Sequence, residues 1–477
     1  MPRRGDVECS ATLGAAAAAG WAYLAEGNAH LVLERRDVAD DDPNVAGRVL
    51  RLRKTKTGTS WRGEDAARDG ARDGALEPCS SACTDASLWA SHPGFQDADS
   101  ADDRSWAFAQ HVMRPLLGGR FVDPGAFVPV DREFLRAVAD AVEPARPRAR
   151  RARSGIDLGA ARAALVPDAR RVDRVRGGVS FSEEEDWFSV EIKPKCGFAL
   201  PGDPEGTSRF VMHQALRVRR GEVRRASAYD PRDLFAGCDE SPFGGVKLTD
   251  ATAKARRVAA LRALADAPRN NLRVRTRARR WPRTDPPERD DRDENLDETL
   301  DAFVAHADVG TEKSFRALGG AARLLALVED ALFSSGVLAA VLRAQRRDAV
   351  GAEAAAKTWR ALSSSDPCSS AVAEAQRKTL RDFVVAAVAK DCSVLVAFRG
   401  ARGDEATKNE DTFAAASAPR GTDPRGPALR FRCRVSVVDV DLKPIANVPK
   451  WLATHREIAE NWASRGADAR DDAARRA

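Results

Sequence analysis

The chain has 477 residues, of which 43% are hydrophobic and 31% are charged, and its formal net charge is +6. This length suits two or three domains or one large two-lobed enzyme, with enough hydrophobic residues for a substantial core. The composition argues against a disulfide framework and a membrane span, because the eight cysteines are scattered and no run approaches about 20 uncharged apolar residues.

The first predicted element is a β-hairpin over residues 21–33. Apolar side chains indicate two strands, and Gly27 and Asn28 between them tolerate the positive φ of a tight turn. Small residues at this turn would let backbone N–H groups approach a phosphate, although an ordinary hairpin explains the stretch better when it is taken alone. Another strand is predicted over 48–54, with Arg51 and Arg53 on one face.

Residues 62–104 are rich in Asp, Arg, Gly and Ser and show no periodicity, which predicts a flexible insertion. Cys79, Cys83 and His92 lie within this insertion. Their loose spacing is not that of a zinc site, so we interpret the cysteines as free thiols.

Two helices are predicted next, over 106–114 and 131–142. Pro115 should end the first helix, because a proline disfavours helical geometry in the residue before it. Asp131 is a suitable N-cap for the second helix.

Two segments complete the predicted first lobe. The basic loop 144–153 is explained for most of its arginines by a solvated linker. Residues 163–168 are predicted to form a short apolar strand that closes the lobe.

The most informative stretch is 188–195, in which apolar and polar residues alternate with the period of a half-buried strand. Glu191, Lys193 and Lys195 therefore share one face, although Pro194 should end the strand ladder. Only 13 of the 77 basic residues are lysines. Two of them spaced about 7 Å apart on a strand suit neighbouring phosphates, and a solvated strand end is an equally good interpretation.

Two helices follow this strand. The helix that begins at residue 209 places His213, Gln214 and Arg217 on one face. The amphipathic helix 251–266 is followed by Asn270 and Asn271, whose amides could donate to phosphates or simply form a turn.

The remaining helices are predicted over 311–347, with breaks at 319–320 and 334–336, and over 352–363 and 369–388. A buried strand begins after Asp391, which would lie at the mouth of that strand. An acidic residue there is either solvated or catalytic.

The last predicted strand ends near residue 443. Its period of two would place Asp439, Asp441 and Lys443 on one face. This arrangement suits Mg²⁺ bridged to phosphate oxygens, and a solvated face of alternating charge is equally consistent. A helix over 451–462 and a disordered tail over 463–477 would end the chain.

Taken in order, these stretches closely resemble the inositol-pentakisphosphate 2-kinases. Each motif alone is weak, whereas all of them in sequence are specific, and together they span residues 20 to 462. The matching segments are residues 26–27, 49–51, 122–125, 191–197, 209–214, 229–235, 270–273, 390–393 and 439–444.

The resemblance implies an α+β, two-lobed, protein-kinase-like fold of the inositol-phosphate kinases. A small β-rich N-terminal lobe would cover 10–168 with the flexible insertion 62–104, and a larger mixed C-terminal lobe would cover 169–462. The implied reaction is ATP-dependent, Mg²⁺-assisted phosphorylation of the 2-hydroxyl of inositol 1,3,4,5,6-pentakisphosphate to inositol hexakisphosphate (phytate). We expect a monomer without a membrane or nucleic-acid partner. We expect it in the cytoplasm or nucleus, because no secretory signal follows Met1.

The resemblance also implies roles for individual residues. Asp391 would be the base that takes the hydroxyl proton, Lys193 would serve both catalysis and ATP binding, and Asp439 would hold Mg²⁺. The nucleotide would contact Glu26, Gly27, Asn28, Ala29, Arg51, Asp168, Glu191, Lys193 and Arg273. The inositide would contact Arg150, Lys195, Arg217, Asn270, Asn271 and Lys443.

Some positions depart from the family pattern. Asn28 and His30 replace small loop residues, and Arg217 replaces a lysine. Asn447 and Trp451 stand where an arginine and a tyrosine are expected. The Cys/His cluster of the plant members is absent from 300–360, so we expect no zinc. The alternatives are a kinase for another inositol polyphosphate and a non-catalytic polyanion- or RNA-binding protein on a kinase scaffold.

Overall fold

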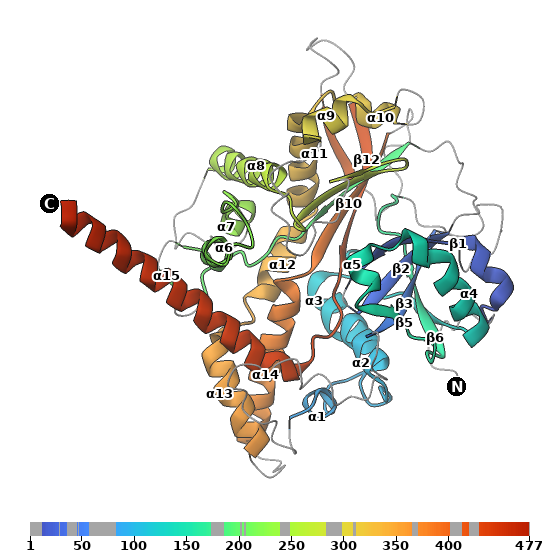
Figure 1. The fold of residues 1–477 in the computed structure, drawn as a ribbon, viewed down its shortest axis with the longest axis horizontal. Helices are drawn as coiled ribbons and strands as arrows, with labels where there is room; N and C mark the ends of the chain where they lie inside the picture. The colour runs from blue at the N-terminus through green and yellow to red at the C-terminus, as the bar shows by residue number, and fades with distance from the viewer. Residues whose placement is uncertain are drawn as a thin grey trace. The chain divides into compact units, whose positions relative to one another are not determined.

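The computed structural model is a mixed α+β structure with two antiparallel sheets (Figure 1). It describes residues 12–27, 29–35, 45, 47–56, 83–172, 186–200, 203–204, 207–238, 249–282, 298–308, 312–364, 371–400, 413–418 and 429–476. The chain divides into two compact units. The first comprises 1–75 and 123–185, and the second comprises 76–122 and 186–477.

The first unit is built on a six-stranded antiparallel sheet in the order β1-β2-β3-β6-β4, with β5 paired to β3. Its strands are β1 (Trp21–Glu26), β2 (His30–Arg35), β3 (Arg48–Lys56), β4 (Ala126–Pro129), β5 (Ser154–Ile156) and β6 (Arg162–Pro167). The predicted hairpin and the strand after it are confirmed as β1, β2 and β3.

Helix α4 (Arg132–Val142) packs against this sheet and completes the core of the first unit. Its buried residues Phe134, Leu135 and Val138 recur at helical spacing and pack with sheet residues such as Leu33. The predicted cap is confirmed, because the Asp131 carboxylate accepts a hydrogen bond from the Phe134 N–H at 2.6 Å. Short helices at 15–20 and 143–145 and α5 (Arg148–Arg151) complete the unit.

The second unit contains the other six-stranded antiparallel sheet, in the order β11-β12-β10-β7-β8-β9. The strands are β7 (Trp187–Ile192), β8 (Leu272–Thr276), β9 (Arg280–Trp281), β10 (Ser393–Gly400), β11 (Phe413–Ala418) and β12 (Leu429–Val438). The strand predicted at 188–192 is confirmed as β7. It is buried on both faces rather than one, because it is a central strand between β10 and β8 in a sheet that helices cover.

Helices pack around this second sheet and around one another (Figure 1). Helix α11 packs on β10, β11 and β12, helix α12 packs on α14 and α3, and helix α15 packs on α13 and α6. Their bounds are α1 (Asp85–Trp89), α2 (Ala101–Phe108), α3 (Arg114–Leu117), α6 (Arg209–Arg219), α7 (Pro231–Leu234), α8 (Asp250–Asp266), α9 (Leu300–Ala305), α10 (Lys313–Arg316), α11 (Ala321–Ser334), α12 (Val337–Gln345), α13 (Gly351–Ser364), α14 (Ala371–Ala389) and α15 (Val448–Arg476).

Helices α11 and α12 are rich in apolar residues. Within the described ranges, no single helix is long and apolar enough to cross a membrane, and this pair meets that test only together, bent by 64°.

The prediction that 62–104 is a flexible insertion is wrong for its second half, while 62–82 lie outside the described residues. Helices α1 and α2 each begin with a capping box, at Thr84 and Ser100, which fixes a short helix without long periodicity. Trp89 stacks on Phe95 with ring centroids 5.1 Å apart and meets Phe108 edge-on. This segment belongs to the second compact unit, whereas the sequence analysis assigned it to the N-terminal lobe.

Two predicted helix ends are also wrong. Pro115 does not stop its helix, because a π-helical turn (Ala109–Met113) leads directly into α3 and the proline lies in the first turn of α3, a position that tolerates proline. The tail predicted as disordered over 463–477 continues α15 as far as Arg476. Its sequence is rich in alanine and arginine, which favour helices, and contains no proline.

Candidate active site

The candidate site lies at one end of the second sheet. Neighbouring strands run in opposite directions. The C-terminal ends of β7 and β12 and the N-terminal ends of β8 and β10 therefore meet at the same end of the sheet. In this register Glu191 pairs with Arg273, and Ser393 pairs with Val438, the last residue of β12. Charged residues that flank these four strand ends are therefore gathered into one cluster.

The first part of the cluster is centred on Lys193 and Asp439. Lys193 Nζ donates to Asp439 Oδ2 at 3.0 Å. Ser393 Oγ lies 3.2 Å from the same oxygen and 2.9 Å from Glu191 Oε1, and Arg273 Nη1 lies 3.9 Å from Glu191 Oε2. Burial alone would lower the pKa of Lys193, but Asp439 and Glu191 outweigh it and raise that pKa above its ordinary value. Lys193 is therefore a permanent cation beside two carboxylates.

The second part places one carboxylate between two ammonium groups. Asp391 Oδ1 accepts a hydrogen bond from Lys195 Nζ at 3.0 Å, and Asp391 Oδ2 accepts one from Lys443 Nζ at 2.8 Å. Burial opposes ionisation of Asp391, but Lys195 and Lys443 hold its pKa well below the usual range. Burial lowers the pKa of Lys195, against the attraction of Asp391. The side chain of Asp391 is still 51% exposed, so a ligand can reach it.

The strand expected at the end of the chain is shorter than predicted. β12 ends at Val438, and Asp439 has φ of 59°, so the period of two does not continue through Asp441 and Lys443. The shared strand face was therefore the wrong reason for grouping these residues. Asp439 and Lys443 nevertheless enter the same cluster, where they contact different partners.

A similar correction applies at the end of β7. The ladder ends at Ile192, before Pro194, and Lys195 has φ of 62°. Lys193 and Lys195 consequently reach two different aspartates instead of projecting in parallel from one strand face.

The two predicted asparagines lie next to this cluster through the backbone. Asn271 O accepts a hydrogen bond from Lys193 N at 2.9 Å. The side chain of Asn271 is almost fully buried, and its Oδ1 has no hydrogen-bond partner among the described residues. Asn270 is exposed. Before them, Arg269 has φ of 44° and donates to Gln214 Oε1 inside the protein.

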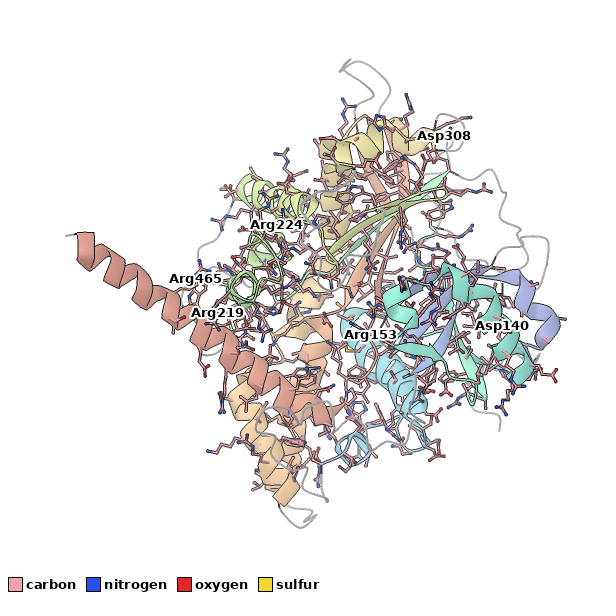
Figure 2. All side chains as sticks on the ribbon, viewed as in Figure 1. Asp140, Arg153, Arg219, Arg224, Asp308 and Arg465 are labelled. Atoms are coloured by element: carbon pink, nitrogen blue, oxygen red, sulfur yellow. The ribbon has the colours of Figure 1, made fainter. Side chains whose placement is uncertain are left out.

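Arg217, by contrast, is not part of the cluster. It lies in the last turn of α6 and donates from Nε to Glu222 Oε2 at 3.1 Å. Arg219, labelled in Figure 2, occupies the same end of this helix. Arg217 therefore stays a prediction from the resemblance, without a contact that links it to the lysines.

In the first unit, Glu26 is engaged by two buried cations that the sequence analysis did not identify. Glu26 Oε2 accepts hydrogen bonds from Lys54 Nζ at 2.6 Å and from Arg146 Nη2 at 3.0 Å, and all three side chains are at most 2% exposed. Burial raises the pKa of Glu26, but its bonds to Arg146 and Lys54 outweigh burial and lower it. Lys54 also donates to Gly27 O at 2.8 Å, which ties down the hairpin turn.

The other predicted residues of this unit are placed as follows. Ala29 is exposed at the turn, and Asn28 lies outside the described residues. Arg51 Nη2 lies 3.2 Å from His30 Nδ1 on neighbouring strands. Asp168, at the end of β6, forms a buried two-point ion pair with Arg170 at 2.8 and 2.6 Å.

Arg150 lies in α5, within the basic loop, and its side chain is partly buried. Its backbone oxygen accepts a hydrogen bond from Ser154 Oγ at 3.5 Å.

Asp439 is suited to Mg²⁺ by the chemistry of its donor atoms. Its side chain is 54% exposed, and the described residues leave Oδ1 without a hydrogen-bond partner. Within the described ranges there is no group of three or more metal-ligating side chains. That is compatible with Mg²⁺, which usually takes one or two protein carboxylates and completes its shell with phosphates and water.

Ser393 is the member of this cluster that sequence reasoning missed. It belongs to the segment Lys390–Ser393, which carried part of the resemblance, but no role was assigned to it. Its hydroxyl can donate to only one carboxylate at a time, so it links Glu191 and Asp439 without neutralising either.

Comparisons with known proteins show the family of this chain. The family model described as inositol-pentakisphosphate 2-kinase matches residues 23–457. The chain is 26% identical to an Arabidopsis thaliana inositol-pentakisphosphate 2-kinase over 92% of each chain, and 25% identical to one from Oryza sativa subsp. indica over 94% of each. It is 32% identical to the Danio rerio enzyme over a shorter stretch, 35% of this chain and 32% of that one. Because the family model spans most of its length, this chain belongs to the inositol-pentakisphosphate 2-kinase family.

Proposed function

We propose that the cluster at the end of the second sheet transfers the γ-phosphoryl group of ATP to the 2-hydroxyl of inositol 1,3,4,5,6-pentakisphosphate. The product is inositol hexakisphosphate. The proposal rests on one observation, the meeting of three lysines and two aspartates at one end of the sheet. Lys193 pairs with Asp439, and Asp391 pairs with both Lys195 and Lys443. Phosphoryl transfer needs mainly this combination of positioned cations and a carboxylate that orients the nucleophile.

Lys193 and Arg273 are proposed to hold the phosphates of ATP. Both already lie beside Glu191 and could turn to a phosphate without leaving the cluster. Asp439 would hold Mg²⁺, which neutralises charge on the phosphate oxygens when it is bound. Ser393 would keep the Asp439 carboxylate oriented through its hydroxyl.

Asp391 is proposed to orient the 2-hydroxyl and take its proton. The hydroxyl oxygen forms a bond to the γ-phosphorus, the bond from that phosphorus to the bridging oxygen of ADP breaks, and the proton moves to the Asp391 carboxylate. Lys195 and Lys443 hold the pKa of Asp391 low. When substrate phosphates attract Lys195 and Lys443, that restraint weakens and the carboxylate becomes a better proton acceptor.

Lys195, Lys443, Asn270 and Asn271 are proposed to bind the inositide. Each phosphate carries about −1.5 to −2 charges at neutral pH, so five of them require several donors. The Oδ1 of Asn271 is buried and can only accept a hydrogen bond, so a contact of this residue with a phosphate would come from its amide NH₂ group.

For the first unit we propose the nucleotide role taken from the family resemblance, with the two units as the two lobes of a kinase-like fold. The nucleotide contacts would come from Gly27, Asn28, Ala29, Arg51 and Asp168. Glu26 would act through Lys54 and Arg146, and Arg150 would contact the inositide. We also propose that the protein acts as a monomer in the cytoplasm or nucleus.

The decisive experiment compares inositol tetrakis- and pentakisphosphates as substrates of the purified full chain with ATP, with and without Mg²⁺. Ion-exchange chromatography of the products should show hexakisphosphate from the pentakisphosphate only when Mg²⁺ is present. Phosphorylation of a tetrakisphosphate at a higher kcat/KM would favour a kinase for another inositol polyphosphate. Binding of the pentakisphosphate without any turnover would favour a non-catalytic protein.

A further inference from the structure

A buried glutamine lies directly behind the lysines and aspartates of the site. Gln345 is the last residue of α12, and its side chain is fully buried. Its Nε2 donates to Lys195 O at 2.7 Å and to Ala389 O at 3.1 Å, and its Oε1 accepts from Gly197 N at 2.8 Å. The carbonyls can only accept and the amide N–H can only donate, so the orientation of the glutamine amide is determined.

These three contacts join two segments that are distant in sequence but meet in the site. One segment carries Lys195, and the other ends at Ala389, two residues before Asp391. The side chains of Lys195 and Asp391 pair at 3.0 Å. Gln345 therefore connects, through the backbone, the same two segments that this ion pair connects through side chains.

The segment around Lys195 needs such support because its backbone is unusual. Lys195 has φ of 62°, a conformation that residues with a side chain seldom adopt and that persists only when the surroundings impose it. At Gly197, a Cβ atom would lie 2.2 Å from Phe235 Cδ2, so a glycine is required. The buried Tyr229 hydroxyl donates to Pro194 O at 2.7 Å, between these residues and β7.

A second contact from the end of α12 reaches the residue beside Asp391. Asp348 is buried, and its Oδ2 accepts a hydrogen bond from Lys390 Nζ at 2.6 Å. Its Oδ1 accepts from Gly351 N at 2.8 Å, which holds the aspartate at the start of α13. The end of α12 and the segment that follows it therefore restrain the chain at two points of the site, Lys195 and Lys390.

We propose that Gln345 is a positioning residue for phosphoryl transfer, which keeps Lys195 and Asp391 in register, and that Asp348 assists it through Lys390. This inference rests on the function proposed above for Lys195 and Asp391. Gln345 itself contacts only backbone atoms and is buried, so it acts through the residues that it holds. Displacement of a catalytic group by about 1 Å can cost roughly 100-fold in rate.

The test uses Gln345→Glu in the full chain. Glutamate has nearly the same shape and keeps an acceptor for Gly197 N. It loses donors, because an ionised carboxylate donates to neither carbonyl and a protonated carboxyl donates to only one of them. We expect kcat for pentakisphosphate phosphorylation to fall about 10- to 100-fold, with the KM for ATP changed by no more than about twofold. A purely structural role would lower the melting temperature and the active fraction without this separation of kcat from KM.

The matched control is Glu312→Gln, at the opposite end of the same sheet. Glu312 is equally buried and accepts hydrogen bonds from Arg279 and from Asp308 N, and Asp308 is labelled beside α10 in Figure 2. This variant should lose thermal stability but keep the wild-type kcat per folded molecule. An equal fall of kcat in the control would contradict the positioning role.

The outcomes separate the two proposals. A wild-type protein without pentakisphosphate turnover would contradict the proposed function, whatever the variants do. An active wild type and a folded Gln345→Glu variant with unchanged kcat would contradict the positioning role alone. If Gln345→Glu does not fold, Asp348→Asn decides. It keeps an acceptor for Gly351 N and weakens the Lys390 contact, so we expect a lower kcat. An unchanged kcat would contradict the inference.

Discussion

Lys195 and Asp391 lie 196 residues apart in the sequence, yet their side chains form an ion pair of 3.0 Å. Lys443 approaches the other oxygen of the same carboxylate at 2.8 Å. A carboxylate held between two cations stays ionised and oriented, and a phosphate group can compete for those cations.

The first prediction concerns this carboxylate. Asp391→Asn keeps the size of the side chain but removes the proton acceptor, so kcat should fall by about 10²- to 10⁴-fold. Inositide affinity should stay equal or increase, because a negative charge beside the phosphates is lost. Isothermal titration and single-turnover assays measure the two effects separately.

The control is Asp382→Asn, which alters a carboxylate on α14 that pairs with Arg347 and Lys378. This variant should change neither kcat nor inositide affinity. Full turnover by Asp391→Asn would show that the base is misassigned.

A second prediction concerns the magnesium requirement. Asp439→Asn should raise the Mg²⁺ concentration for half-maximal activity at least about tenfold, because an amide oxygen binds Mg²⁺ less strongly than a carboxylate. Ser393→Ala removes only the hydroxyl that lies 3.2 Å from Asp439 Oδ2, so it should shift the same midpoint by a smaller factor. A Mg²⁺ titration of initial rates for both variants tests this order. The opposite order, or no shift in either, would place the metal elsewhere.

The third prediction concerns the buried ion cluster of the first unit. Glu26→Gln leaves Lys54 without its buried counter-ion and should cost about 3–5 kcal/mol of stability at neutral pH. Glu34→Gln is the control, because its carboxylate is 38% exposed and should contribute about 1 kcal/mol or less. Urea unfolding followed by hydrogen exchange in β1 to β3 measures both.

The same cluster predicts how stability depends on pH. The pKa of Glu26 is lower in the folded protein than its ordinary value, mainly because hydrogen bonds from Arg146 and Lys54 outweigh burial. Its stabilising contribution is therefore complete above the unfolded pKa of about 4.3 and is lost as pH falls through the lower folded pKa. Lys54 stays protonated in this acidic window and adds no change. The difference between wild type and Glu26→Gln should shrink between pH 5 and the most acidic pH at which the protein stays folded, and a constant difference would contradict the assignment.

A fourth prediction concerns α1 and α2, which begin within the expected insertion. Asp85 Oδ1 accepts from Ile445 N at 2.8 Å, and Ser105 Oγ accepts from Leu442 N at 3.2 Å. Both contacts hold the backbone on either side of Lys443. Asp85→Ala leaves a buried N–H without a partner and should cost about 1–3 kcal/mol, with a higher KM for the inositide.

Asp85→Asn provides the matched comparison, because its amide oxygen can still accept from Ile445 N. It should restore most of the stability and KM. Thermal unfolding and steady-state kinetics of the two variants decide the matter: equal losses in both would show that the charge of Asp85, rather than its hydrogen bond, is important.

Local patterns in the sequence were sufficient for several elements. The alternation over 188–192 predicted β7, and Asp131 before an amphipathic segment predicted the start of α4. Both signals come from residues that are close together in the sequence, so no distant contact is needed to interpret them. The prediction failed at 83–104 because it relied on a long hydrophobic period, whereas these short helices are fixed by capping boxes and a Trp89–Phe95 stack.

The sequence by itself determined the chemical inventory of this protein: rare lysines around residue 193, aspartates after and before buried strands, and an ordered set of motifs that belongs to one family. Only the tertiary structure decided that Lys193 meets Asp439 while Lys195 and Lys443 share Asp391, and that Gln345 is buried behind them. The physical reason is that antiparallel pairing of strands up to about 200 residues apart, and backbone turns with positive φ at Lys195 and Asp439, set these partners. Side-chain periodicity describes one element at a time and carries no information about which strand ends meet.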